Sequence, residues 1–395
     1  MALGLYISVP FCRTKCTYCN FASDVFSRGA FERYVERICA DIAGARDAAH
    51  HNGGRFEQEV DSAYLGGGTP TILDSQQLER IFVTIRQNFR LLPSSEVTVE
   101  CAPGTLSQGT IESLLRCGVN RVSLGVQSFV DQEAASVGRL HKRAVVLDDI
   151  ARLRAAGITN INVDLIAGLP HQTAASWEFS LTEAIATDVP HVSVYMLEVD
   201  EDSRLGRELI AGGTRYHAHF VPDDELTADL YLAACERLEA AGLAQYEISN
   251  FARADFPSRH NLKYWQRLPY LGFGVDAHSM LLSAAADHNA VRFSTPETLE
   301  AYVGGGPLEV TPISHHAALE ESFFLGLRLS EGVDLTALQA RFGEEAVHQF
   351  CAAIAQSTAD GLLIHEGHQI RLTSRGRLLS NEVFARFLSA ERTVV

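Results

Sequence analysis

The strongest constraint on the fold is the alternation of short apolar runs with amphipathic stretches over the first 200 residues. The apolar runs are rich in β-branched residues and are bounded by Gly, Pro or Asn, which is typical of strands. They are Leu3–Val9, Ser62–Leu65, Glu96–Glu100, Arg121–Val126, Asn160–Ile166 and His191–Leu197. Helical patterns lie between them, for example Phe31–Ala45, Ser75–Phe89 and Val145–Ala156. This alternation predicts an α/β fold of parallel βαβ units, either an open sheet or a barrel.

The pattern changes after about residue 200. Leu226–Ala241 predicts a helix, Gln245–Phe251 a strand, and residues 252–276 a polar loop. Three further helices are predicted at Ala317–Leu327, Leu335–Phe342 and Glu345–Ala359, followed by a hairpin at Leu362–Leu372 and a closing helix at Ser374–Leu388. We therefore predict a mainly helical, winged-helix-like C-terminal domain. The expected division is a core at residues 1–225, an extension and linking region at 226–310, and a C-terminal domain at 311–395.

Charge and hydropathy exclude several classes of protein. The formal net charge is -16, with 49 acidic against 33 basic residues, which argues against nucleic-acid binding. No run of 18 apolar residues is present, so no transmembrane helix is expected. The first residues lack the basic start, long apolar middle and cleavage site of a signal peptide. We expect a cytoplasmic protein, and any membrane contact is expected to be peripheral and made through a protein partner.

Three cysteines, Cys12, Cys16 and Cys19, follow the first predicted strand directly. Three thiolates on one tight loop can hold three corners of a cubane iron–sulfur cluster and leave the fourth iron without a protein ligand. The alternative is structural zinc, which takes four ligands, usually as two separated pairs. No second Cys or His pair at such a spacing lies nearby. The spacing therefore favours the cluster.

The cysteine spacing resembles that of the radical S-adenosylmethionine (SAM) superfamily. That resemblance implies a partial (β/α)6 TIM-like barrel, a [4Fe–4S] cluster on Cys12, Cys16 and Cys19, and bound SAM. Gly66-Gly67-Gly68-Thr69 follows the second predicted strand and lacks the Gly-Lys-Ser/Thr of a P-loop. It resembles the glycine motif of the superfamily. By that likeness, Gly67, Gly68 and Thr69 approach the amino group of SAM.

Polar residues at the ends of the later strands resemble the coproporphyrinogen-oxidase-like branch of the superfamily. They are Glu100, Gln127 in Ser123–Phe129, Arg139 in Gly138–His141, and Asp164 in Asn162–Pro170. The resemblance implies that all four contact SAM, with carboxylates for its hydroxyl and ammonium groups and Arg for its carboxylate. The branch also implies SAM contacts at Tyr6 and Tyr18, although strand packing explains Tyr6 almost as well. No catalytic residue is assigned.

Two departures separate the chain from the oxygen-independent coproporphyrinogen III oxidases of this branch. Phe21 stands where those enzymes carry a fourth cysteine, and only eleven residues precede Cys12 where they carry a longer extension. His260-Asn261-Leu262-Lys263-Tyr264-Trp265 instead matches the HNxxYW signature of the HemW-type heme chaperones. The resemblance runs from about residue 3 to beyond residue 380.

The resemblance implies a protein that binds heme and transfers it to acceptor apoproteins, with flavodoxin or ferredoxin as a one-electron donor. His260, Asn261, Tyr264 and Trp265 are the candidate heme residues, because imidazole ligates heme iron and aromatic rings stack on porphyrins. The alternative is that His260 and Asn261 only bind a loop to the barrel. Two enzymatic alternatives stay open. One is coproporphyrinogen III oxidation, and the other is radical chemistry on an unknown substrate, with reductive cleavage of SAM in either case.

Overall fold

The computed structural model describes residues 1–388 and is built around a twelve-stranded mixed sheet. Its strand order is β12-β11-β10-β9-β1-β2-β3-β4-β5-β6-β8-β7. The parallel strands are β1 (Leu3–Val9), β2 (Glu59–Gly67), β3 (Arg90–Cys101), β4 (Arg121–Gln127), β5 (Asn160–Ala167) and β6 (His191–Met196). The helices between them are α1 (Arg28–Ala43), α2 (Ala45–His51), α3 (Ser75–Asn88), α4 (Gln108–Arg116), α5 (Asp131–Ser136), α6 (Arg143–Ala155) and α7 (Ala174–Ala186), with a 3-10 turn, η1, at Pro70–Ile72. The predicted α/β class is confirmed.

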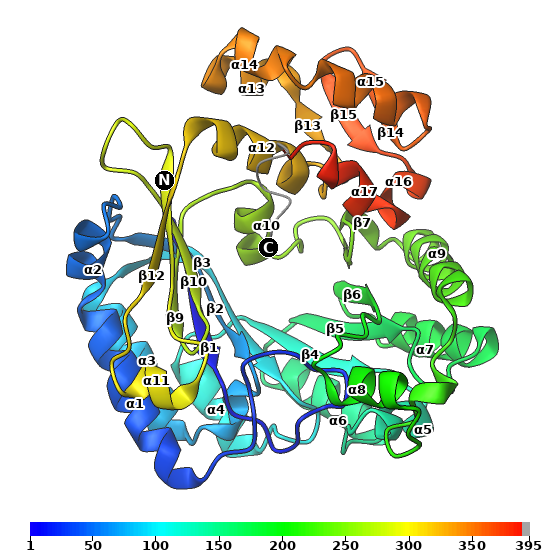
Figure 1. Cartoon of the computed structure of the whole chain (residues 1–395). Helices are drawn as coiled ribbons and strands as arrows, with labels where there is room; N and C mark the ends of the chain where they lie inside the picture. The colour runs from blue at the N-terminus through cyan, green and yellow to red at the C-terminus, as the bar shows by residue number, and fades with distance from the viewer. Residues whose placement is uncertain (389–395) are drawn as a thin grey trace.

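The two faces of the parallel strands differ in polarity because successive side chains point to opposite sides. Val122, Leu124 and Val126 of β4 are fully buried and join the main apolar core. Helix residues such as Leu114 of α4 and Leu153 of α6 belong to the same core, and Figure 1 shows these helices outside the curved sheet. The alternate positions carry polar side chains, so the concave face of the sheet is a polar interior.

The segment after β6 extends both edges of the sheet. It contains α8 (Arg204–Ala211), η2 (Ala218–Phe220), α9 (Asp224–Ala240), β7 (Ala244–Glu247), β8 (Asn250–Ala252), α10 (Arg259–Trp265), β9 (Tyr270–Gly274), β10 (His278–Leu282), β11 (Ala290–Ser294), α11 (Leu299–Val303) and β12 (Glu309–Ile313). Strands β8 and β7 pair antiparallel beside β6, while β9 pairs parallel with β1. The single predicted strand at Gln245–Phe251 is therefore wrong, since two short strands form a hairpin there.

The predicted polar loop at residues 252–276 is also wrong, because it contains α10 and β9. Ser258 caps α10 by accepting a hydrogen bond from the Asn261 N–H at 3.3 Å. The helix is buried through polar side chains, so it carries no apolar periodicity to reveal it. Strand β9 contains Gly272, and glycine is unusual inside a strand, so the sequence pattern does not indicate a strand there. Glycine is needed at this position because a Cβ at Gly272 would overlap the carbonyl of His278 on β10.

The chain ends in a mainly helical unit with its own apolar core. It contains α12 (His315–Gly326), β13 (Val333–Asp334), α13 (Leu335–Phe342), α14 (Glu344–His348), α15 (Cys351–Ala359), β14 (Leu363–Glu366), β15 (Gln369–Leu372), α16 (Ser374–Leu378) and α17 (Ser380–Ala385). Phe323, Phe350 and Phe387 are central to this core. The predicted hairpin is present, whereas the closing helix is interrupted at Leu379.

The three-part division of the chain stays a prediction, and residues 389–395 of its last part lie outside the described residues. In the part that the structure describes, no helix has both the length and the apolar character needed to cross a membrane.

Candidate functional site

Cys12, Cys16 and Cys19 lie on the loop between β1 and α1, where backbone hydrogen bonds fix the loop from several sides. The Cys12 N–H donates to the Asp24 carbonyl at 3.0 Å, and the Thr17 N–H donates to the Val137 carbonyl at 3.1 Å. The loop is therefore attached to the segment that precedes Arg139. The loop lies at the carboxyl ends of the parallel strands, where α/β folds gather their reactive groups.

The three thiols are buried or half-buried and lie near enough to interact electrostatically. Burial raises the pKa values of Cys12 and Cys19, and the neighbouring thiols raise them further. Bound iron stabilises thiolates in such surroundings. Among residues 1–388, no three His, Cys, Asp or Glu side chains are arranged around a single metal ion. A cubane does not need that arrangement because each thiolate binds its own iron, so the donor set fits three corners of a [4Fe–4S] cluster.

The glycine motif packs against the cysteine loop. The Gly68 N–H donates to the Val9 carbonyl at 2.8 Å, and the Thr69 N–H donates to the Phe11 carbonyl at 2.7 Å. Gly67 has a φ of +96°, and a Cβ at Gly68 would lie 2.6 Å from the Phe11 carbonyl oxygen. Only glycine allows this approach of two backbones.

Two half-buried carboxylates, Glu100 and Asp164, lie on the polar interior of the sheet. Glu100 accepts from the Tyr64 hydroxyl at 2.8 Å and from the Gly67 N–H at 3.2 Å. Burial raises the pKa of Glu100 to about 7 against these hydrogen bonds. Asp164 accepts from the Ser123 hydroxyl at 3.0 Å and from the Asn162 amide at 2.7 Å, and burial also raises its pKa.

Arg139 joins the carboxylates to the cysteine loop. Its Nε donates to Oε1 of Gln127 at 2.6 Å. Burial lowers the pKa of Arg139, but Tyr18, Cys16 and Asp164 together outweigh burial, so the net shift is upward. These electrostatic partners show that the guanidinium lies near both the cysteine loop and Asp164. A cation held there can bind a carboxylate group.

Gln127 owes its position to an irregularity in β4. Its φ is 63°, in the left-handed region, and the register of β4 with β5 shifts between Gly125 and Gln127. A Cβ at Gly125 would overlap the Arg139 guanidinium. Strained non-glycine backbone of this kind is concentrated at functional sites. Sequence reasoning missed Gly125, although a glycine inside a strand pattern signals a bulge or a close approach.

Tyr6 and Tyr18 occupy different surroundings. Tyr6 on β1 stacks with Tyr64, with ring centroids 6.0 Å apart. Tyr18 lies on the cysteine loop and packs against a small apolar cluster that contains Val137 and Leu169. Burial raises the pKa of both phenols, so both are neutral hydrogen-bonding groups.

The HNxxYW residues lie at the opposite end of the polar interior, on α10. His260 is 1% exposed, and both of its ring nitrogens have partners, Nδ1 with the Ser62 hydroxyl at 3.0 Å and Nε2 with the Tyr264 hydroxyl at 2.8 Å. Asn261 is half-buried in the same turn. The Trp265 ring lies 4.2 Å from the Arg328 guanidinium.

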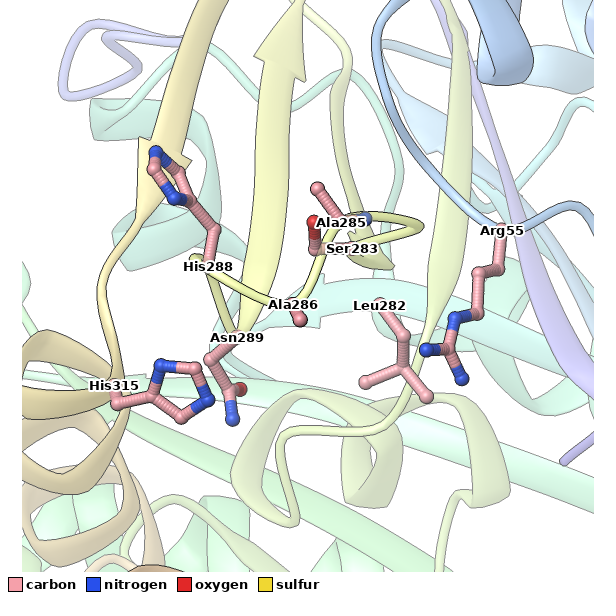
Figure 2. Close-up of a pocket in the computed structure, with 8 residues that line it drawn as sticks. All are labelled: Arg55, Leu282, Ser283, Ala285, Ala286, His288, Asn289 and His315. Atoms are coloured by element: carbon pink, nitrogen blue, oxygen red, sulfur yellow. Dashed lines mark hydrogen bonds between the residues drawn. The ribbon is translucent and has the colours of Figure 1, made fainter.

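A separate cavity of about 220 Å³ lies away from all of these residues (Figure 2). It is formed by the turn between β10 and β11, the start of α12, and Arg55. Its lining residues are Arg55, Leu282, Ser283, Ala285, Ala286, His288, Asn289 and His315. None of the predicted cluster, SAM or heme residues contributes to it.

Comparisons with known proteins establish the family and the fold of the chain. A model of the radical SAM superfamily matches residues 6–183, and a model of the HemN C-terminal domain matches residues 313–379. The heme chaperone HemW of Bacillus subtilis is 33% identical over 97% of this chain and 98% of its own length. The chain belongs to the HemW family. The HemW of a Synechocystis species is 36% identical over 84% of this chain and 79% of its own.

The fold of this HemW-family protein is also found in a solved structure. Coproporphyrinogen III oxidase (HemN) from Escherichia coli, described as a radical SAM enzyme, superposes with a TM-score of 0.80. It shares 22% identity and covers 98% of this chain and 90% of its own. This likeness concerns the fold alone, and it confirms the predicted radical SAM architecture with a C-terminal domain.

Proposed function

We propose that this HemW-family protein is a heme chaperone that binds heme and transfers it to acceptor apoproteins. The observation that carries the proposal is the similarity over 97% of the chain to a relative named as a heme chaperone. The departure from the oxidase pattern at Phe21 agrees with it. Heme and the acceptor proteins are thus the expected partners, in the cytoplasm.

The scaffold for this function is a [4Fe–4S] cluster on Cys12, Cys16 and Cys19 with SAM beside it. When bound, the two supply reductive cleavage of a carbon–sulfur bond, with flavodoxin or ferredoxin as the proposed electron donor. Arg139 would hold the SAM carboxylate, while Glu100 and Asp164 would take ammonium and hydroxyl groups. Gly67, Gly68 and Thr69 would present backbone to the amino end. Gln127 would orient Arg139, and Tyr6 and Tyr18 would flank the bound molecule.

Heme titration of the cluster-reconstituted full chain, followed by visible absorbance, tests the chaperone function. We expect a saturable complex with one heme per chain. The His260→Phe variant is expected to keep its heme, because both imidazole nitrogens of His260 are engaged within the protein. Loss of heme in that variant would support the hypothesis that His260, Asn261, Tyr264 and Trp265 hold it.

The same preparation distinguishes the alternative function. Absence of saturable heme binding, together with SAM-dependent turnover of coproporphyrinogen III, would replace the chaperone with an oxidase. Turnover of coproporphyrinogen III without an electron donor would contradict both the heme chaperone and the radical SAM oxidase.

A further inference from the structure

We propose that His260 of the HNxxYW motif is a positioning residue for the SAM site, acting through Tyr64 on Glu100. The inference rests on the proposed SAM site and gives the motif a task within it. Three successive contacts support it. They lead from α10, at the amino ends of the parallel strands, to the Glu100 carboxylate near their carboxyl ends.

The first contact fixes the imidazole. Ser62 on β2 and Tyr264 on the next turn of α10 bind the two ring nitrogens of His260, so the ring cannot rotate without losing both hydrogen bonds. Burial, with a smaller contribution from Lys263, lowers the pKa of His260 to about 3. The ring is therefore neutral at physiological pH, with one nitrogen as donor and the other as acceptor.

The second contact is a triangular cluster of three rings. His260 stacks on Tyr64 with centroids 5.4 Å apart and an interplanar angle of 28°. Tyr6 lies against both, at 6.0 Å from Tyr64 and 6.2 Å from His260. Aromatic side chains have only two rotatable angles. The imidazole and Tyr6 thus determine the plane of Tyr64 and the position of its hydroxyl.

The third contact reaches the carboxylate. The Tyr64 hydroxyl donates to Oε1 of Glu100 at 2.8 Å, while the Gly67 N–H donates to Oε2. Each oxygen has its own donor, so loss of either donor frees the carboxylate to turn. The space is tight as well: a Cβ at Gly66 would lie 2.8 Å from Glu100 and 2.9 Å from Tyr64. A shift of the Tyr64 ring therefore moves the hydroxyl donor away from Oε1 of Glu100.

The start of α10 also closes a small cavity beside the carboxylate of Asp164. Ser258 and Asn261 line a cavity of about 20 Å³ together with Tyr64 and Asp164. That volume holds about one water molecule. Lys263 anchors the helix in this place through a 2.7 Å ion pair with Asp61.

Tyr64→Phe, His260→Phe and the double variant test the sequence of contacts in the cluster-reconstituted full chain. SAM affinity is measured by equilibrium dialysis, and the response of the reduced cluster to SAM by electron paramagnetic resonance. We expect Tyr64→Phe to weaken SAM binding about tenfold, the order of one hydrogen bond to a charged group. His260→Phe is expected to weaken it severalfold. Because His260 acts through the tyrosine hydroxyl, the double variant should bind no more weakly than Tyr64→Phe.

Tyr231→Phe is the matched control, since it removes another buried hydroxyl, which donates to the Ile248 carbonyl at 2.6 Å away from the site. It should leave SAM affinity unchanged. If His260→Phe does not fold, Ser62→Ala replaces it, because that change removes only the partner of Nδ1.

The outcomes separate this inference from the proposed function. A wild-type cluster whose spectrum does not respond to SAM would overturn the proposed SAM site and this inference with it, whereas the chaperone function is tested separately by heme titration. A wild type that responds, with SAM affinity unchanged in Tyr64→Phe and His260→Phe, would overturn the positioning role alone. Additive losses in the double variant would do the same, because they would show that His260 acts independently of the Tyr64 hydroxyl.

Discussion

At the scale of single residues, Glu100 shows how burial and hydrogen bonding compete. Burial raises its pKa, and the nearby charge of Asp164 raises it further. The hydrogen bonds from Tyr64 and Gly67 and the charge of Arg139 lower it, and the balance lies at about 7. A carboxyl group with this balance changes charge in the physiological range, and such groups are concentrated at functional sites.

SAM affinity should therefore depend on pH. Below a pKa of about 7 the Glu100 carboxylate is protonated and no longer attracts a ligand ammonium. Affinity should fall roughly tenfold from pH 8 to pH 6, following the ionised fraction. Dissociation constants of the cluster-reconstituted protein across this range check the expectation. Glu100→Gln should bind weakly with a much flatter profile, and an unchanged slope in that variant would assign the pH dependence to another group.

At the scale of the elements, periodicity made most of the α/β core predictable. The parallel strands alternate apolar and polar residues, and helices with apolar faces lie between them, so β1 to β6 could be predicted from sequence. Helix α10 could not, since His260 and Lys263 are buried through hydrogen bonds and an ion pair. A buried polar contact leaves no periodic signal in the chain.

The candidate site was predictable to a similar extent. The family resemblance singled out Glu100, Gln127 and Asp164, the strand pattern placed them on neighbouring strands, and the structure brings them to one polar interior. The hydroxyl of Tyr64 on Glu100 could not be predicted, because that contact depends on the register of β2 with β3. Nor does the sequence indicate the left-handed backbone of Gln127.

The packing of the glycine motif on the cysteine loop yields a second prediction. In Gly68→Ala the new methyl group would lie 2.6 Å from the Phe11 carbonyl oxygen and 2.8 Å from that of Val9. Both are backbone atoms, so the loops must separate. We expect a loss of stability of about 1–3 kcal/mol and a lower iron content per chain after reconstitution. Iron and sulfide analysis with urea unfolding measures both.

Gly29→Ala is the control for this change, because beyond its chain neighbours and the backbone of its own helix no atom lies within 4 Å of the added Cβ. It should keep wild-type iron content. Equal iron content in Gly68→Ala would contradict the claim that the two loops need this close approach.

At the scale of the whole molecule, a buried ion pair connects the sheet region to the C-terminal helices. Arg267 follows α10 and donates from Nε to Glu321 on α12 at 2.7 Å, and both side chains are almost fully buried. Arg292 on β11 lies 3.2 Å from the other oxygen of Glu321. Figure 1 shows α12 between the strands and the C-terminal helices, so this carboxylate lies at their junction.

Glu321→Gln should therefore destabilise the protein strongly. It removes the negative charge beside two arginines, and an uncompensated buried charge costs about 3–5 kcal/mol. Urea unfolding followed by circular dichroism measures the loss. Glu79→Gln, in the exposed pair with Arg116, should cost less than about 1 kcal/mol. Similar losses in both variants would mean that the junction does not depend on this charge.

Helix α10 packs against β2 on one side and α12 on the other, so it belongs to two environments at once. When two ligands affect the same structural element, each changes the binding affinity of the other by the same factor. Under the proposed positioning role of His260, a molecule that binds the C-terminal helices and displaces α10 would change the affinity for SAM by some factor. SAM must then change the affinity for that molecule by the same factor. If SAM binds as proposed, this helix of seven residues couples the SAM site to the C-terminal helices.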